Sequence, residues 1–282
     1  MESLGKPESE PQYFTSESDR FGFSRFASHP FFGEVNRWLV ERVATLGHRF
    51  VDLACGPGAV TELILAAMKE RGRGLIYAVD PSLSELARAR RRITSSLVQF
   101  VHGSAENLSR LVPQVDVVVF CNAIHLIRDK GQVLSEIRKV LGAGGTLAFN
   151  TTFFKGCYPP GTERFYRYWI LRAAEYLRER GITLVRPEKS EAFQWVSTEQ
   201  YAALVTAAGF VAPSWHIQQV QLSRESLEDI GQFSLFVQGA LPQVPLEVGA
   251  DALRQAVRKA MEDVKLDSIP RFWLQFIARA PA

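Results

Sequence analysis

The chain has 282 residues, a formal net charge of +3 and 46% hydrophobic residues. This composition is ordinary for a globular protein with one large domain. The longest apolar run with the character of a strand core, residues 117–121, is far shorter than the roughly 20 residues that a membrane helix needs. The positive charge is spread along the chain, so we do not expect nucleic acid as a partner.

The first 12 residues are polar and lack the basic and apolar stretches of a secretion signal. We expect a flexible tail at residues 1–18, a single domain at 19–282 and a cytoplasmic location. Three cysteines, Cys55, Cys121 and Cys157, match neither a zinc pattern nor a CxxC pattern. We therefore expect a reduced protein without a metal site.

Strands and helices are expected to alternate through the first half of the chain. Apolar runs predict strands at 49–54, 74–79, 97–102, 116–121 and 145–152, whereas helical spacing predicts helices at 35–43, 59–71, 83–93 and 131–140. This alternation predicts a parallel sheet with helices on both faces. The nearly continuous apolar character of the strands agrees with burial on both sides.

The second half of the chain does not continue this regular alternation of strands and helices. Helices are expected at 162–180, from Ser197 to near residue 209, at 226–236 and at 250–264, with strands at 210–222 and 272–278. Gln200 follows Ser197 at the spacing of a capping box. The stretch from Tyr13 to Trp38 is rich in aromatic residues. For residues 13–26, a helix packed on the sheet and a flap over a ligand both remain open.

The strongest motif is a glycine turn that follows the first strand, Asp52-Leu53-Ala54-Cys55-Gly56-Pro57-Gly58. Gly56 and Gly58 allow positive φ angles and a close approach of a ligand to the backbone. The N-terminus of the next helix offers free N–H groups. Thr61 stands where a dinucleotide fingerprint has its third glycine, and no lysine follows the glycines as in a P-loop.

Asp80 ends the second expected strand, about 20 residues beyond the glycine turn, where an acidic side chain can accept the hydroxyls of a ribose. A helix cap ahead of Pro81 and Ser82 is the alternative. Together with the glycine turn, the position favours ribose binding.

In this order, the motifs resemble those of class I S-adenosylmethionine (SAM)-dependent methyltransferases. Residues 52–58 are similar to the family's first motif, with Ala54 in place of its first glycine, and residues 77–82 are similar to its ribose-binding strand end. Residues 103–108 resemble the adenine-side stretch, with Ser104 where the family has an aspartate. Residues 115–125 and 141–147 resemble the fourth strand and the turn before the fifth.

The resemblance implies a Rossmann-like α/β fold, with a seven-stranded, mostly parallel sheet whose last strand is antiparallel, and SAM as the cofactor. It also implies in-line attack of an acceptor on the sulfonium methyl group. The residues expected to bind the cofactor are Asp52, Ala54, Gly56, Gly58, Asp80, Pro81, Ser104, Ala105, Glu106 and Asn122.

His125, in the loop after the fourth strand, is the candidate catalytic residue. It could act as a general base for a hydroxyl or carbon acid, or pack beside the methionyl end of SAM without a proton role. The N/D-P-P-Y/F motif of methyltransferases that act on nucleic-acid amines is absent at this place, which argues against such an acceptor.

Two long inserts, at about 153–196 and 223–270, are expected to form a helical lid above the carboxyl ends of the strands. Phe153, Tyr166, Trp169 and Trp195 are expected to line an apolar acceptor pocket. The arginines of residues 164–180 are expected on a solvated face. An anion clamp or contact with an anionic membrane surface is the alternative.

We therefore predict a SAM-dependent methyltransferase that acts on an oxygen or carbon of a small, apolar or amphipathic metabolite, similar to the quinone-biosynthesis methyltransferases. The alternatives are an NAD-dependent oxidoreductase, which would share the glycine turn and Asp80, and a SAM-binding module without catalysis.

Overall fold

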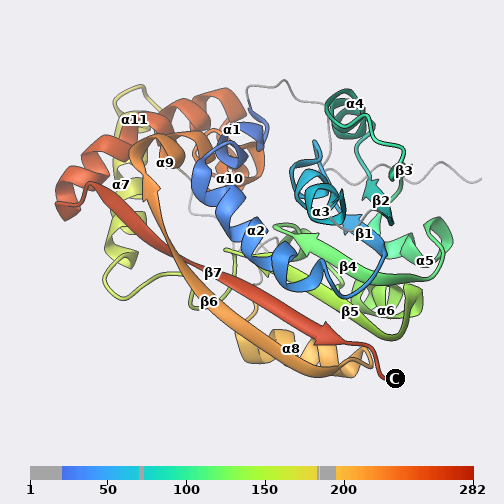
Figure 1. The fold of residues 1–282 in the computed structure, drawn as a ribbon. Helices are drawn as coiled ribbons and strands as arrows, with labels where there is room; N and C mark the ends of the chain where they lie inside the picture. Colours follow the sequence, from blue (N-terminus) through green and yellow to red (C-terminus); the bar gives the residue numbers. More distant parts are fainter. Residues whose placement is uncertain (1–20, 70–72, 183, 185–194) are drawn as a thin grey trace, which may run out of the picture.

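The computed structural model describes residues 21–69, 73–182, 184 and 195–282, so the tail predicted at 1–18 lies outside the described residues (Figure 1). Seven strands form one sheet in the order β3-β2-β1-β4-β5-β7-β6. Their bounds are β1 Arg49–Leu53, β2 Leu75–Asp80, β3 Val98–His102, β4 Val115–Cys121, β5 Leu141–Thr151, β6 Val211–Ser223 and β7 Ser268–Arg279. The pairs among β1–β5 are parallel, and β7 runs antiparallel to both of its neighbours. The predicted fold class is confirmed.

Helices cover both faces of this sheet. On one face lie α2 (Pro30–Val43), α3 (Ala59–Lys69) and α4 (Leu83–Arg92), which bury Leu39, Ile64 and Leu86 against the strands. On the other face lie α5 (Leu108–Leu111), α6 (Lys130–Val140) and α8 (Thr198–Ala207). Within β4, Val117 and Val119 face the first group of helices and Val118 and Phe120 face the second, which explains the continuous apolar run.

Local signals correctly predicted where several helices begin. The Ser82 hydroxyl accepts the Glu85 N–H at the start of α4. Ser197 and Gln200 form both hydrogen bonds of a capping box at the start of α8. These interactions satisfy backbone N–H groups that a helix N-terminus leaves without partners.

The helix predicted at 226–236 is two helices, α9 (Arg224–Ile230) and α10 (Ser234–Ala240). The break begins at Gly231, which has poor helix propensity and lies so close to Trp169 that a Cβ there would be 3.0 Å from the indole ring. Phe233 takes an extended backbone conformation and caps α10. Its ring packs edge-on against Phe23, with centroids 5.1 Å apart. This tertiary contact, between residues 210 positions apart, overrides the helical pattern.

The segments predicted to form a lid meet in a second hydrophobic core. It contains buried residues of α7 (Glu163–Arg178), α9, α10 and α11 (Leu246–Val264), together with the ends of β6 and β7 that face them. Figure 1 shows β6 and β7 running across the molecule and these helices gathered at one end of them. The short helix α1 (Ser24–Ala27) adds Phe26 to the same core.

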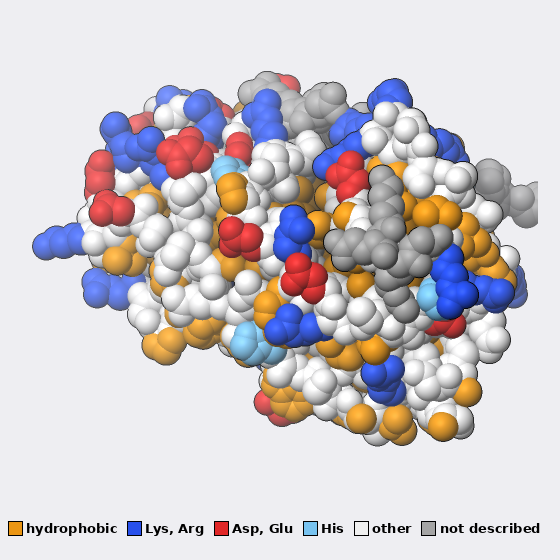
Figure 2. Space-filling model, in the orientation of Figure 1, with side chains coloured by type: hydrophobic (Ala, Val, Ile, Leu, Met, Phe, Trp, Pro, Cys, Tyr) orange, Lys and Arg blue, Asp and Glu red, His pale blue; other side chains and the backbone are white. Residues whose placement is uncertain are grey.

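Trp169 lies at the centre of the lid. It is fully buried, its indole N–H donates to the Leu253 carbonyl at 2.7 Å, and its ring stacks on Phe236 at 5.2 Å. At the surface, Arg172 of α7 forms a bidentate ion pair with Asp263 of α11, both bonds being 2.7 Å. Figure 2 shows acidic and basic side chains interspersed over this end of the molecule.

No helix among the described residues is long and apolar enough to cross a membrane.

We expect Trp169→Ala to destabilise the protein by about 3–5 kcal/mol, because it removes a buried ring and leaves a cavity. Leu171→Ala is the matched control on the same helix, since Leu171 is 45% exposed and its loss should change stability by less than about 0.5 kcal/mol. Urea unfolding followed by circular dichroism measures both. Similar losses for the two variants would contradict the assignment of Trp169 to the lid core.

Candidate functional site

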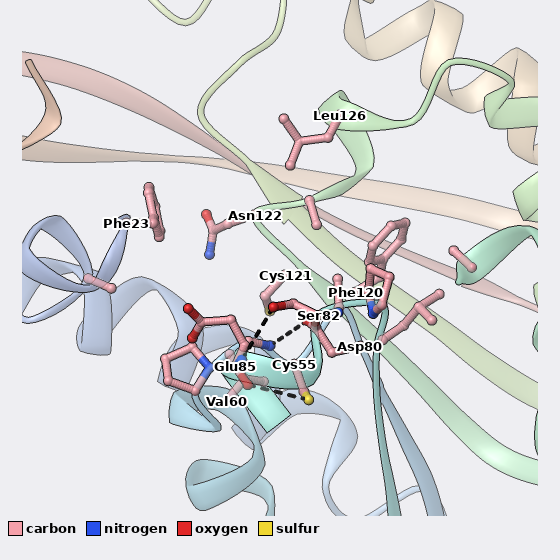
Figure 3. Close-up of a pocket in the computed structure, with 18 of the residues that line it drawn as sticks. Phe23, Cys55, Val60, Asp80, Ser82, Glu85, Phe120, Cys121, Asn122 and Leu126 are labelled. Carbon is pink, nitrogen blue, oxygen red and sulfur yellow. Dashed lines mark hydrogen bonds between the residues drawn. The ribbon is translucent and has the colours of Figure 1, made fainter. Parts of the chain in front are cut away.

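A cavity of about 720 Å³ opens at the carboxyl ends of β1, β2 and β4. Its wall includes the loops after β1, β2, β3, β4 and β5, together with residues of the N-terminal segment at 21–27 and of the loop between α9 and α10. Figure 3 shows Asp80 and Glu85 on one side of the cavity, and Phe23 and Leu126 farther up around it. The volume suits a cofactor together with a small second ligand.

The glycine turn is built as its residues predict. Ala54, Gly56 and Gly58 all have positive φ angles, of 56°, 52° and 91°. Gly56 lies on the cavity wall and has open space where a Cβ would be. Gly58 instead packs against α4, because a Cβ there would be 2.8 Å from Ile93. Of the two glycines, only Gly56 is thus placed to approach a ligand.

Asp80 holds the glycine turn and faces the cavity. Its two carboxylate oxygens accept the backbone N–H groups of Gly56 and Ser82, each at 2.8 Å. Burial raises the pKa of Asp80, and the two hydrogen bonds oppose this shift. Each oxygen keeps a second lone pair, so the carboxylate can still accept two hydroxyl groups, as a ribose would require. Pro81 lies beside it on the cavity wall.

Asp52 does not lie on the cavity wall, although the resemblance placed it among the cofactor-binding residues. Its carboxyl group is buried behind the turn and accepts the Thr61 hydroxyl of α3 at 2.5 Å. Burial raises its pKa to about 7, the Thr61 hydrogen bond opposes the shift and the charge of Asp80 adds to it. Asp52 therefore ties β1 to α3 instead of contacting a ligand.

The loop after β3 forms the adjoining wall, with Ser104, Ala105 and Glu106. Glu85 of α4, which the sequence did not single out, joins them. Burial raises the pKa of Glu85, with a smaller contribution from the charge of Asp80, and Arg88 pairs with it at 3.2 Å. A helix-face glutamate has no distinctive sequence signal, so only the fold reveals this placement.

Asn122 ends β4 in a left-handed conformation, with φ of 55°. Its side-chain NH₂ donates to the Asn36 Oδ1 at 3.0 Å, and its Oδ1 accepts the indole N–H of Trp273 at 3.0 Å. Its backbone N–H donates to Asn150, whose own amide donates to Asn36 at 2.9 Å. The amide of Asn122 is thus engaged with α2 and β7, and the residue also lies on the cavity wall, as its predicted place in the cofactor site requires. Asn36, Asn150 and Trp273 are far from it in the sequence, and no short motif connects them.

His125 lies on the cavity wall in the short helix η4 (Ile124–Leu126). Its Nδ1 is 3.0 Å from the Thr151 hydroxyl oxygen, which also accepts the Phe153 N–H. The ring packs against Phe153 with centroids 4.4 Å apart. Burial lowers the pKa of His125 to about 3, and the charges of Lys130 and Arg271 contribute. The imidazole is therefore neutral across the physiological pH range.

Of the four residues predicted for the acceptor pocket, only Phe153 lies on the cavity wall. The prediction for Trp169 is wrong, because that ring fills the lid core. Tyr166 and Trp195 are also off the wall and instead surround the guanidinium of Arg271, with ring centroids 5.1 and 5.9 Å from its carbon. The helical spacing of Tyr166 and Trp169 thus marks packing within the lid.

Besides Phe120 and Phe153, the aromatic residues of the wall come from the N-terminal segment, α2 and the loop between α9 and α10: Phe21, Phe23, Phe32 and Phe233. Phe21 and Phe23 belong to residues 13–26, for which a flap over a ligand remained open. Residues 13–20 lie outside the described residues. Leu126 and Ile127 complete the apolar surface next to His125.

Residues 51–149 match the family model described as a methyltransferase domain. A ubiquinone biosynthesis O-methyltransferase of Pseudomonas entomophila is 29% identical over 117 residues, which is 40% of this chain and 48% of that protein. A ubiquinone/menaquinone biosynthesis C-methyltransferase of Allorhizobium ampelinum is 25% identical over 174 residues, 58% of this chain and 65% of that protein. The chain therefore spans about half to two thirds of the length of these relatives.

Among solved structures, phosphoethanolamine N-methyltransferase 2 of Haemonchus contortus in complex with SAM has a TM-score of 0.55. It is 19% identical in sequence, and the match covers 95% of this chain and 58% of that one. This likeness concerns the fold.

Asp80 and Asp52 provide a matched test of the site. We expect Asp80→Asn to weaken the binding of S-adenosylhomocysteine at least tenfold, because the variant loses one carboxylate oxygen at the cavity and its charge. Asp52→Asn should leave the affinity unchanged, because the Asn oxygen can still accept the Thr61 hydroxyl away from the cavity. Isothermal titration calorimetry measures both. Equal affinities of Asp80→Asn and the unmodified protein would rule out the assignment of Asp80.

Proposed function

We propose that this chain, which carries a class I SAM-dependent methyltransferase domain, transfers the methyl group of SAM to an oxygen or carbon of a small lipophilic acceptor. The predicted family and cofactor are confirmed by the match of residues 51–149. The acceptor and the transfer itself are our proposal.

The observation that carries the proposal is the continuity of a single cavity. One part of its wall has Asp80, Gly56 and the loop after β3, and another part has His125 and the apolar rings. A cofactor that lies along the first part therefore has its reactive end in the same enclosure as an apolar second ligand. Enclosure of this kind positions the two reactants and excludes water.

A small molecule fits this enclosure better than a nucleic acid does. Phe21, Phe23 and Phe233 give the wall an apolar aromatic surface, and the residues after β4 are Asn122-Ala123-Ile124-His125, without the motif of base-amine methyltransferases. The quinone-biosynthesis relatives support a lipophilic ring compound as the acceptor, although they match only part of this chain.

When bound, SAM supplies a methyl group on a sulfonium, which leaves as a neutral thioether and needs no acid from the protein. An acceptor hydroxyl that took the methyl group would have to lose its proton. In the tautomer in which Nδ1–H donates to Thr151, the Nε2 of His125 is free to take that proton. Its low pKa keeps the ring in the neutral form that can accept a proton.

Thermal shift and methyl transfer together test the proposal. A ligand at 100 times its dissociation constant adds about 2.7 kcal/mol to stability, and each kcal/mol raises the melting temperature of a chain of this size by about 2–4 °C. We expect shifts with SAM and S-adenosylhomocysteine and none with NAD, and transfer of radiolabelled methyl from SAM to members of a panel of phenols and hydroxyquinones. A shift with NAD alone would support the oxidoreductase alternative. Binding of SAM without transfer to any compound of the panel would favour a non-catalytic module.

We expect His125→Ala to lower kcat by about a hundredfold, the usual scale of general-base catalysis, while the affinity for S-adenosylhomocysteine stays the same. Because the pKa of His125 is lowered to about 3, the unmodified enzyme should show no loss of activity through imidazole protonation between pH 8 and pH 5. His216→Ala, an exposed histidine that stacks on Trp38, is the control and should keep full activity. Unchanged kcat in His125→Ala would mean that the residue only packs against the cofactor.

A further inference from the structure

The charged residues on the cavity wall are segregated. The acidic side chains, Asp80, Glu85 and Glu106, come from the ends of β2 and β3 and from α4. The loops after β4 and β5, on the other side of β1 in the sheet, contribute no acidic side chain to the wall but do contribute Arg128. Arg88 also lies on the cofactor side, but its charge is paired with that of Glu85. The cofactor side is therefore acidic and the acceptor side basic.

Arg128 differs from Arg88, the other arginine on the wall, in having no acidic partner among the described residues. It follows Leu126 and Ile127 on the same loop as His125, its side chain is exposed, and it forms no ion pair or hydrogen bond with any residue of the described part of the chain. The neighbouring Asp129 is used otherwise, because its carboxylate accepts the Gln132 N–H and caps α6. A free guanidinium beside an apolar chamber is suited to a carboxylate, which it can bind with two parallel hydrogen bonds.

Two further cations make this side of the cavity positive. Lys130 is half-buried and donates to the Ile127 carbonyl at 2.7 Å. Arg271 is 5% exposed, and it donates from Nε to the Thr152 hydroxyl and from Nη2 to the Thr152 carbonyl, both at 2.9 Å. It pairs with no acidic residue among those that the structure describes, and its guanidinium carbon lies 5.5 Å from the ring centroid of Phe153 on the cavity wall.

Arg271 cannot itself bind the ligand, because it lies behind the wall and is enclosed by the rings of Phe153, Tyr158, Tyr166 and Trp195. Its charge still acts on the chamber, because screening by water is weak around a buried group. His125 stays neutral and adds no charge of its own. An apolar chamber with a positive surround and one free guanidinium at its edge favours an apolar ligand that carries a negative charge.

We propose that the methyl acceptor is a carboxylate-bearing ring compound, and that Arg128 binds its carboxylate at the edge of the apolar chamber. This inference rests on the proposed function and specifies its substrate class. The acceptor's ring would lie among Leu126, Ile127 and the aromatic residues of the cavity wall, with its reacting atom near His125. Arg128 would then determine specificity without taking part in the chemistry.

Matched pairs of ligands test the inference on the full chain saturated with S-adenosylhomocysteine. The pairs are 3,4-dihydroxybenzoate, 4-hydroxycinnamate and 3-hydroxy-2-naphthoate, each with its neutral carboxamide, and calorimetry gives the affinities. We expect at least one carboxylate to bind about tenfold more tightly than its amide. In Arg128→Gln this preference should disappear, whereas Arg110→Gln, an exposed arginine of α5 away from the cavity, should keep it.

The affinity for S-adenosylhomocysteine shows whether Arg128 binds the carboxylate of the acceptor or that of the cofactor. Arg128→Gln should leave that affinity unchanged; an equal loss there would mean that Arg128 binds the methionyl carboxylate of the cofactor, and the inference would fall. Amides that bind as tightly as carboxylates, or no binding by any carboxylate of the series, would also overturn it while leaving the proposed function standing. If the unmodified protein does not bind S-adenosylhomocysteine at all, the proposed function itself is contradicted.

Discussion

The amide cluster of Asn36, Asn122, Asn150 and the indole of Trp273 joins four elements near the carboxyl ends of β4 and β5. Each polar group that is buried there without a partner would cost about 1–3 kcal/mol, so the cluster is stable only when α2, β4, β5 and β7 are all in place. Two donors converge on the Asn36 Oδ1, and the left-handed Asn122 has both ends of its amide engaged. The cluster thereby holds three parts of the chain in one arrangement: the start of the His125 loop, the N-terminal aromatic segment and β7.

The two halves of the site depend on different parts of the chain. The cofactor side rests on local turns: the backbone of Gly56 and Ser82 is held by Asp80, and Asp52 ties β1 to α3 from behind. The acceptor side rests on long-range packing, because Phe23 is held by Phe26, Phe32 and Phe233 from three different elements. His29 and Asp229, 2.8 Å apart, join the same two regions. A change in the lid would therefore affect the acceptor chamber before it affects the cofactor turn.

This difference explains how far the sequence could predict the structure. The glycine turn, Asp80, the capping box at Ser197 and the alternation of strands and helices are short-range patterns, and the structure has all of them. Two of the four residues predicted for the acceptor wall, Tyr166 and Trp169, come from helix α7, and they pack within the second hydrophobic core. Whether an apolar helix face covers a core or a ligand depends on what packs opposite, here α11 and Gly231. A single sequence does not contain that information.

The family match covers the cofactor side of the cavity and part of the acceptor side. Residues 51–149 contain the glycine turn, Asp80, the loop after β3 and the loop with His125 and Arg128. Phe21, Phe23, Phe32, Phe153 and Phe233 all lie outside that range. The match therefore supports SAM as the cofactor and leaves much of the acceptor side to segments outside residues 51–149. Because function depends on sites carried by a fold and not on the fold itself, the charge on either side of the cavity is better evidence for the acceptor than any relative's name. The buried guanidinium of Arg271 supports the assignment of positive charge to the acceptor side. Burying an ion of this kind costs several kcal/mol. Its two hydrogen bonds and four surrounding aromatic rings offset that cost only when the rings next to the chamber stay closed around the guanidinium.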